Sequence, residues 1–412
     1  MRKIHKNMWM LLWVMLLDKI SVNITFPILT FVFFSTNSHL FVENTSYAMR
    51  SYWYGICLSI PHLLGIFSIP LLSIVSDSIG RKSILMITAV AAFVFALSCS
   101  FGILLGSLAL VLLGKFVGGF LSRTDAVAQA AVADYSTTEN KLNNMARLQV
   151  VISMGAALGP MLGGYFAEGP WFGVLNYALP YLIATLFAIA TVIFIILCLK
   201  EDAVKKVTVK TNFNDLFQLL SYKPVLKISF LLLLVQISWG SYYQFIPPVL
   251  KTTFHFSAMQ VGLFVGLVAL WLALASAFAV PILKRHFQSN QIINYCCYGL
   301  LVGMLSTLLA SMLVTNAEIA KSLLWVGAVL ISASDVVIYA IISTLYSNAV
   351  GEAQQGTVMG ICFIIYSIVW ALVALLGGFI AGYAVILPIW VGMIGIILAI
   401  LWQHYKPLEV IA

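Results

Sequence analysis

Long apolar runs alternate with short polar connections along the whole chain. A helix that crosses the roughly 30 Å of bilayer hydrocarbon needs about 20 apolar residues, and each of these runs is close to that length or longer. The pattern predicts twelve membrane-spanning helices, at residues 8–34, 51–76, 83–104, 106–133, 147–167, 177–199, 225–250, 258–283, 291–313, 321–348, 356–377 and 384–403. We therefore predict an all-α membrane protein.

The longest polar segment lies in the middle of the chain, between the sixth and the seventh predicted span. It divides the sequence into two six-helix halves, residues 1–199 and 225–412, joined by a cytoplasmic linker at 200–224.

Composition excludes a water-soluble fold. Hydrophobic residues make up 62% of the 412 residues and charged residues 9%, whereas about a quarter of a soluble domain is charged. The six cysteines all fall in apolar runs, and none recurs at the spacing of metal ligands. We therefore expect neither a metal nor a cofactor.

The net charge of +8 could suggest nucleic acid, but in a membrane protein the location of Lys and Arg carries more information than their sum. If the N-terminus is cytoplasmic, only three basic residues lie outside: Arg50, Lys251 and Lys321. Apart from the basic residues inside the spans, the others fall at the cytoplasmic ends of spans or in the linker. This asymmetry predicts that both termini are cytoplasmic and that the partner is the lipid bilayer, not nucleic acid.

The loop between the second and third spans reads Ser73-Ile-Val-Ser-Asp77-Ser-Ile-Gly80-Arg81-Lys82. Glycine permits a tight turn, and an acidic residue beside a basic pair can form charge-assisted bonds between helix ends that break and reform during gating. We predict a gating loop at Asp77, Gly80, Arg81 and Lys82. The alternative is that these charges only fix the topology.

The fifth span contains Gly155-Ala-Ala-Leu-Gly159-Pro160-Met-Leu-Gly163-Gly164. Glycines four residues apart let helix backbones approach closely, and proline removes one backbone hydrogen bond, so the helix can pack tightly and bend. Simple small-residue packing is the alternative interpretation.

Both segments resemble signatures of the major facilitator superfamily, G-x-x-x-D-R-x-G-R-R/K for the loop and G-x-x-x-G-P-x-L-G-G for the helix. The second is typical of the drug:proton antiporter branch. Further stretches are similar to the tetracycline-efflux-like group, at residues 17–29, 114–134 and 355–360. The resemblance covers nearly the whole chain and is strongest in its first half.

The resemblance implies a major facilitator fold, with twelve transmembrane helices in two six-helix halves around a central cavity, in the cell inner membrane. It also implies a monomer that moves a small-molecule substrate by alternating access. The chain departs from the family at Ser73 and Ser78 in the loop and at Lys115, Arg123 and Asp125 in the fourth span. The resemblance therefore predicts the fold of this chain, but it does not predict the substrate.

Ionisable residues at membrane depth cost at least a few kcal/mol, and they usually face a partner or a water-filled cavity. This chain has Asp18, Lys19, Lys115, Arg123, Asp125 and Asp335. The spans that carry them are among those that the resemblance places around the cavity. We predict transport and proton-coupling roles for Asp18, Lys19, Lys115, Asp125 and Asp335; mutual structural pairing is the alternative.

Helical spacing relates some of these residues to one another. In the fourth span, Lys115, Asp125 and Gln129 fall along one stripe with Gly119 and Ser122. In the first span, Lys19 and Asn23 share a face. Asp18 lies about 100° around the helix from Lys19, so it could serve a neighbouring helix.

Amide and aromatic side chains gather in the seventh and eleventh spans, a mixture suited to an amphipathic or planar ligand. Aromatic residues near helix ends also form interfacial belts, which is the alternative. The predicted substrate cavity comprises Asn23, Arg123, Gln129, Gln236, Trp239, Tyr243, Gln244, Tyr366 and Trp370.

Two transport readings stay open. The first is a proton-coupled exporter, a substrate:proton antiporter of a small amphipathic compound. The second is a proton-coupled importer of an anionic metabolite or metal chelate, which the basic residues Lys19, Lys115 and Arg123 would suit. A membrane enzyme or receptor would need a nucleophile motif, a His or Cys cluster or a sensing domain, and the sequence has none.

Overall fold

A computed structural model describes residues 2–35, 38–42, 44–121, 124–137, 140–169, 173, 175–199, 219–351 and 354–405. Regular structure in these ranges is helical throughout. The helices are α1 (Arg2–Asn23), α2 (Phe26–Phe34), α3 (Tyr47–Ile79), α4 (Arg81–Leu104), α5 (Leu108–Leu121), α6 (Thr124–Asp134), α7 (Lys141–Ala167), α8 (Leu175–Cys198), α10 (Lys223–Thr252), α11 (Ala258–Leu274), the π-helical turn η1 (Ala275–Ala279), α12 (Val280–His286), α13 (Ser289–Met312), α14 (Ala317–Asn348), α15 (Gln355–Ala381) and α16 (Leu387–Tyr405).

Each predicted span coincides, within the described residues, with one helix or with consecutive helices. Ten of these helical segments are long and apolar enough to cross a membrane, and Leu108–Leu121 is a shorter apolar helix. The all-α membrane fold is therefore confirmed. Several helices begin or end a few residues beyond the predicted limits, because a helix continues past the apolar run into polar turns. Most of the predicted linker, residues 200–218, lies outside the described part.

The first of the predicted spans is built from two helices. It is divided between Asn23 and Phe26, and Pro27 follows at the start of α2. Proline has no backbone N–H to donate, so it costs least in the first turn of a helix, where that N–H has no partner in the helix. The fourth span is covered by α5 and α6, with residues 122 and 123 outside the described part, and Thr124 and Asp125 are the first described residues of α6.

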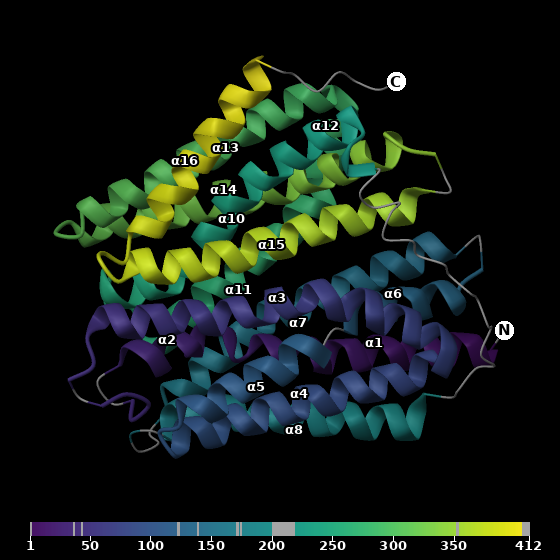
Figure 1. Ribbon diagram of the computed structural model, residues 1–412, viewed down its shortest axis with the longest axis horizontal. Helices are drawn as coiled ribbons and strands as arrows, with labels where there is room; N and C mark the ends of the chain where they lie inside the picture. Colours follow the sequence, from purple (N-terminus) through teal and green to yellow (C-terminus); the bar gives the residue numbers. More distant parts are fainter. Residues whose placement is uncertain are drawn as a thin grey trace. The chain divides into compact units, whose positions relative to one another are not determined.

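The chain forms two compact units. Unit 1 comprises Met1–Arg50, Ile60–Val209 and Phe256–Leu270, and unit 2 comprises Ser51–Ser59, Lys210–His255 and Trp271–Ala412. In unit 1, α1 packs against α7 and α8, and α4 packs against α5 and α8; in unit 2, α10 packs against α15 and α16, and α13 against α14 (Figure 1). The division into halves at 1–199 and 225–412 stays a prediction.

Unit 1 has a well-packed apolar cluster at the start of α1. Leu11 and Met15 are fully buried there, among side chains of α4, α6, α7 and α8. The charged turn of α1 follows directly after this cluster, so its helix is held on several sides.

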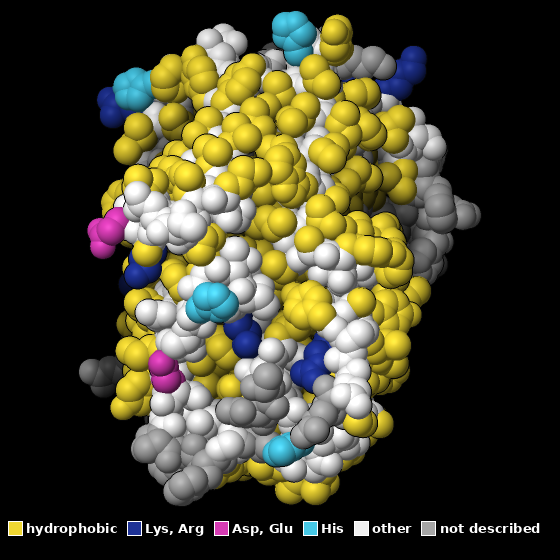
Figure 2. Space-filling model, turned by 90° about the vertical axis from the view of Figure 1, so that its left-hand side faces the viewer, with side chains coloured by type: hydrophobic (Ala, Val, Ile, Leu, Met, Phe, Trp, Pro, Cys, Tyr) yellow, Lys and Arg dark blue, Asp and Glu magenta, His cyan; other side chains and the backbone are white. Residues whose placement is uncertain are grey.

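Many large hydrophobic side chains of the described residues are exposed. Phe67, Leu186 and Phe278 are each more than half exposed. Figure 2 shows one face on which hydrophobic side chains predominate and charged ones are sparse. Such a surface would be unfavourable in water, whereas lipid tails accommodate it. The chain is therefore a multi-pass membrane protein.

Candidate functional site

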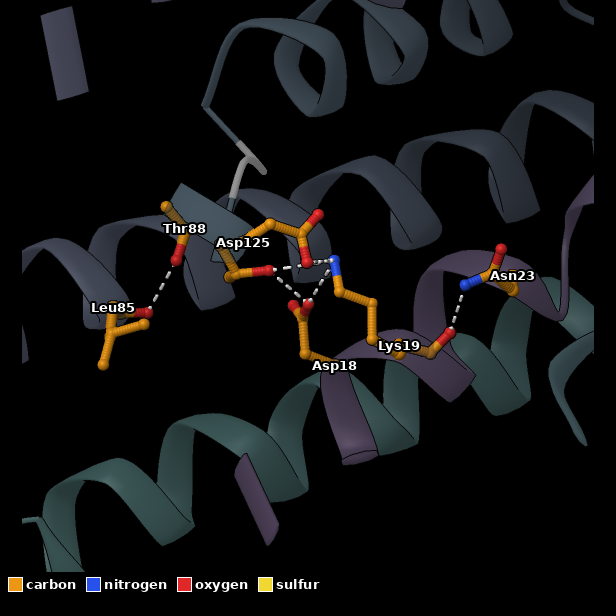
Figure 3. A network of polar contacts seen from close by, with 7 residues as sticks. Asp18, Lys19, Asn23, Leu85, Thr88 and Asp125 are labelled. Carbon is orange, nitrogen blue, oxygen red and sulfur yellow. Dashed lines mark hydrogen bonds and ion pairs between the residues drawn. The ribbon is translucent and has the colours of Figure 1, made fainter. Parts of the chain in front are cut away.

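The charged residues of α1 and α6 form a compact polar cluster in unit 1 (Figure 3). The Lys19 ammonium lies 2.9 Å from Asp125 Oδ1 and 3.5 Å from Asp18 Oδ2. It also donates a hydrogen bond of 3.2 Å to Thr124 Oγ1, which in turn donates to Asp18 Oδ2 at 2.5 Å. We call Asp18, Lys19, Thr124 and Asp125 the charge cluster.

The two carboxylates of the charge cluster differ sharply in exposure. The Asp18 side chain is 1% exposed and that of Asp125 is 54% exposed, while the Lys19 side chain between them is 11% exposed. Asp18 Oδ1 is buried without a hydrogen-bond partner. The cluster thus connects an accessible acid to a buried one through a single ammonium and a hydroxyl.

Local structure explains why these groups meet. Asp18 and Lys19 point about 100° apart on α1, yet both reach the first turn of α6, where Thr124 and Asp125 are adjacent. Sequence reasoning missed Thr124, because a neutral hydroxyl does not stand out; its position beside Asp125 was the available signal.

The glycine and proline motif of α7 packs directly against the charged turn of α1. A Cβ atom on Gly159 would lie 2.7 Å from Asn23 Cβ, and Cβ atoms on Gly155 and Gly163 would overlap Lys19 and Ile24. Only glycine permits so close an approach. Asn23 donates a hydrogen bond of 2.8 Å to the Lys19 backbone carbonyl, so it supports the turn from within α1.

The other side of the same motif faces α11. A Cβ atom on Gly262 would meet the Pro160 carbonyl oxygen, and one on Gly164 would meet the Ala258 carbonyl oxygen. Helix α7 is therefore held between α1 and α11, with close backbone contact on both sides.

The loop before α4 contains a left-handed glycine and a helix-to-helix ion pair. Gly80 has a φ of 96°, a conformation that side chains disfavour. Arg81 Nε lies 3.0 Å from Asp134 Oδ2 at the end of α6. Lys82 is half-buried beside it, and the Asp77 side chain lies outside the described part. Sequence reasoning missed Asp134 as the partner, because the pairing joins distant spans.

The other predicted residues of unit 1 lie apart from this arrangement or outside the described part. Lys115 is 8% exposed, and its ammonium lies 5.2 Å from the centre of the Phe95 ring. Gln129 is exposed on α6, and Arg123 lies outside the described residues. The stripe along the fourth span is therefore only partly described.

In unit 2, the predicted cavity residues meet in one cluster centred on Trp370. Its indole N–H donates to Gln236 Oε1 at 3.0 Å, and its backbone carbonyl accepts from Gln244 at 3.2 Å. Ring centroids of Tyr366 and Trp370 lie 4.9 Å apart, those of Tyr243 and Trp370 6.0 Å, and those of Trp239 and Tyr243 5.1 Å. We call these six residues the amide–aromatic cluster.

Comparison with known proteins relates the chain to drug-resistance transporters. It is 27% identical over 188 residues to the class H tetracycline resistance protein of Pasteurella multocida, which covers 44% of each chain. It is 22% identical over 373 residues to the class E protein of Escherichia coli, 87% of this chain and 83% of that one. The chain spans about half the length of the class H and class B proteins.

Solved structures show the same fold at low identity. The human organic anion transporter MFSD10 (TETRAN) matches 97% of this chain and 99% of its own, with a TM-score of 0.67 and 18% identity. The match to a D-xylose-proton symporter covers 97% of this chain and 98% of that one, with a TM-score of 0.74 and 14% identity. The family model described as Major Facilitator Superfamily matches residues 8–374. The chain therefore belongs to the Major Facilitator Superfamily and is a transporter, not an enzyme.

Proposed function

We propose that this protein is a proton-coupled exporter, a substrate:proton antiporter that works by alternating access in the cell inner membrane. In this account, the halves 1–199 and 225–412 rock about the linker 200–224, a monomer suffices, and both termini are cytoplasmic. The observation that carries the proposal is the charge cluster of Asp18, Lys19, Thr124 and Asp125.

The charge balance of this cluster favours a mobile proton. Among the described residues, two carboxylates share one ammonium, so the fully ionised cluster has a net charge of −1, with Asp18 and Lys19 buried. An uncompensated charge at membrane depth costs several kcal/mol, and one bound proton neutralises it. Binding and release of that proton changes which carboxylate Lys19 pairs with, and so changes the contacts between α1 and α6.

The geometry also supports a route for the proton. Asp125 is exposed enough to exchange protons with water, while Asp18 is buried. Thr124 Oγ1 accepts from Lys19 and donates to Asp18, so it links the ammonium to the buried carboxylate. Because α7 packs closely against Lys19 and Asn23 on one side and against α11 on the other, a shift in this turn would move α7 and α11 as well.

Export is favoured by the glycine and proline motif of α7 and by the likeness to tetracycline resistance proteins. Import of an anionic metabolite or metal chelate is the second candidate function. One observation favours it: Lys115 is buried over the Phe95 ring, and no described residue forms an ion pair with it.

The test uses inside-out vesicles with an acidic lumen and a pH-sensitive dye. Candidate compounds are added, and those that are exported release the proton gradient only when the protein is present. Asp18→Asn should lose this response, whereas Glu318→Gln, an exposed carboxyl in the first turn of α14, should keep it. A compound whose transport is driven equally well by both variants would contradict proton coupling through the cluster.

A further inference from the structure

Asp335 of α14 is a second buried carboxylate, in unit 2, and it has no counter-charge among the residues that the structure describes. It is 5% exposed, and its Oδ1 has no hydrogen-bond partner. No described group of His, Cys, Asp and Glu residues surrounds it to hold a metal ion. An isolated carboxylate at membrane depth is costly unless a positive charge accompanies it. A positively charged group from outside the described residues would remove this cost.

The face of α14 that carries Asp335 can be identified from its neighbours on the same stripe. Tyr339 lies one turn further along, and its hydroxyl accepts a hydrogen bond from Cys362 of α15 at 3.9 Å. Tyr346 lies on the same stripe, and its hydroxyl is 2.7 Å from Ser229 Oγ of α10. Residues separated by four and eleven positions share one side of a helix. Asp335 therefore lies on the side of α14 that meets α10 and α15.

The level of Asp335 along the helices follows from the same two contacts. Helices α14 and α15 are consecutive spans joined by a short connection, so they run in opposite directions. Asp335 lies one turn before Tyr339 on α14. In the same direction along α15, Tyr366 lies about 6 Å beyond Cys362. Asp335 lies eleven residues before Tyr346, and on α10 Gly240 lies eleven residues beyond Ser229, the contact of Tyr346. A Cβ on Gly240 would lie 3.6 Å from Trp370 Nε1. Both routes place Asp335 level with the amide–aromatic cluster.

The chemistry at this level suits one kind of ligand. Stacked rings of Tyr366 and Trp370 offer π faces, which attract both planar rings and cations. Gln236 and Gln244 hold Trp370 in place, and Gln244 Oε1 is itself buried without a hydrogen-bond partner, free to accept from a ligand N–H. Aromatic faces, an amide acceptor and a carboxylate together match an aromatic amine.

We propose that Asp335 and the amide–aromatic cluster bind the positive charge and the ring of a planar organic cation. This inference rests on the proposed function and names its substrate class. The carboxylate pairs with the ammonium group, while Tyr366 and Trp370 contact the ring system. The apolar remainder of the molecule is then enclosed by side chains of α10, α14 and α15.

Binding is tested without any gradient, on the purified full chain in lipid nanodiscs. The probes are rhodamine 6G, a cation, and fluorescein, an anion, which share a planar xanthene ring; fluorescence anisotropy reports the Kd of each. Rhodamine 6G should bind more tightly. Asp335→Asn should weaken its binding by about tenfold or more, and Asp335→Glu should retain most of the affinity, because the charge remains.

Two further variants separate loss of the site from loss of the fold. Glu318→Gln removes an exposed carboxyl at the start of the same helix and should leave both Kd values unchanged. Tyr366→Leu keeps Asp335 but removes one aromatic ring, so it should raise the Kd for rhodamine 6G by about threefold or more. Each variant is compared only if it elutes as a single species with a melting temperature near that of the unmodified protein.

Equal binding of the two dyes, tighter binding of fluorescein, or an unchanged Kd for rhodamine 6G in Asp335→Asn would overturn the inference. These outcomes are independent of proton coupling, which the vesicle assay measures through Asp18 in unit 1. If antiport depends on Asp18 but dye binding does not depend on Asp335, only the proposed substrate class is contradicted. If dye binding depends on Asp335 but no gradient-driven transport is found, the proposed function is contradicted instead.

Discussion

At the scale of single residues, the charge cluster depends on one ammonium shared by two acids of very different exposure. Lys19 is nearer to the exposed Asp125 than to the buried Asp18, at 2.9 Å against 3.5 Å. Thr124 compensates, because its hydroxyl donates to the buried carboxylate. We infer that the neutral hydroxyl is as necessary to the cluster as its charges.

This role of Thr124 can be tested with two substitutions. Thr124→Val keeps the size of the side chain but leaves Asp18 without its hydroxyl donor, which costs roughly 1.5–3 kcal/mol for a hydrogen bond to a charged group. Gradient-driven transport should therefore fall by about tenfold or more. Thr124→Ser retains the donor and should transport at nearly the unmodified rate. Equal rates in the two variants, measured in the same vesicles, would exclude a role for the hydroxyl.

Lys19 is expected to stabilise the fold as well as to serve transport. Lys19→Met leaves two carboxylates without a cation, and breaking a buried pair costs about 3–5 kcal/mol. The melting temperature of the purified protein should fall clearly. Adding Asp125→Asn removes one of the stranded charges, so the double variant should recover part of the loss. Additive losses in the double variant would show that the two residues do not interact.

At the scale of elements, the close packing of α7 on α1 brings the fold and the charge cluster together. Gly155 and Gly163 leave no space for a methyl group against Lys19 and Ile24. Any added atom must push α1 away from α7, and with it the turn that carries Asp18. The motif thus has a definite structural task, in addition to making α7 able to bend.

Gly155→Ala and Gly163→Ala should impair gradient-driven transport strongly and lower the melting temperature. The matched control is Gly360→Ala in α15, where a Cβ would meet nothing within 4 Å. There the change should be neutral or stabilise the helix by up to about 1 kcal/mol, because alanine is the better helix former. Full transport activity of the α7 variants would show that the close approach of α1 is dispensable.

The spans could be predicted from the sequence alone, whereas a break within a span and a contact between spans could not. The spans were predictable, because a run of about 20 apolar residues is a strong signal for a helix in lipid. The division of the first span before Phe26 was not, because apolar patterning does not respond to one interrupted turn. The pairing of Arg81 with Asp134 was also missed, since sequence spacing says nothing of contacts between distant spans.

At the scale of the whole molecule, the distribution of basic residues predicts the orientation, and a labelling experiment can test it. The six native cysteines lie in helices and are buried or half-buried, so they should react little with a membrane-impermeant maleimide. Ala48→Cys, at the exposed start of α3, should react in intact cells. His286→Cys, at the end of α12, should react only after the cells are opened. The reverse pattern would contradict cytoplasmic termini.

The central claim is that a proton moved by Asp18 and its partners drives transport. The most direct measurement compares two modes of transport in the same proteoliposomes, using a compound identified in the vesicle assay. One mode is uptake driven by a pH gradient, and the other is exchange of labelled for unlabelled substrate without a gradient. Asp18→Asn should abolish the first and retain the second, because exchange needs no net proton movement. Intact gradient-driven uptake by Asp18→Asn would contradict the account.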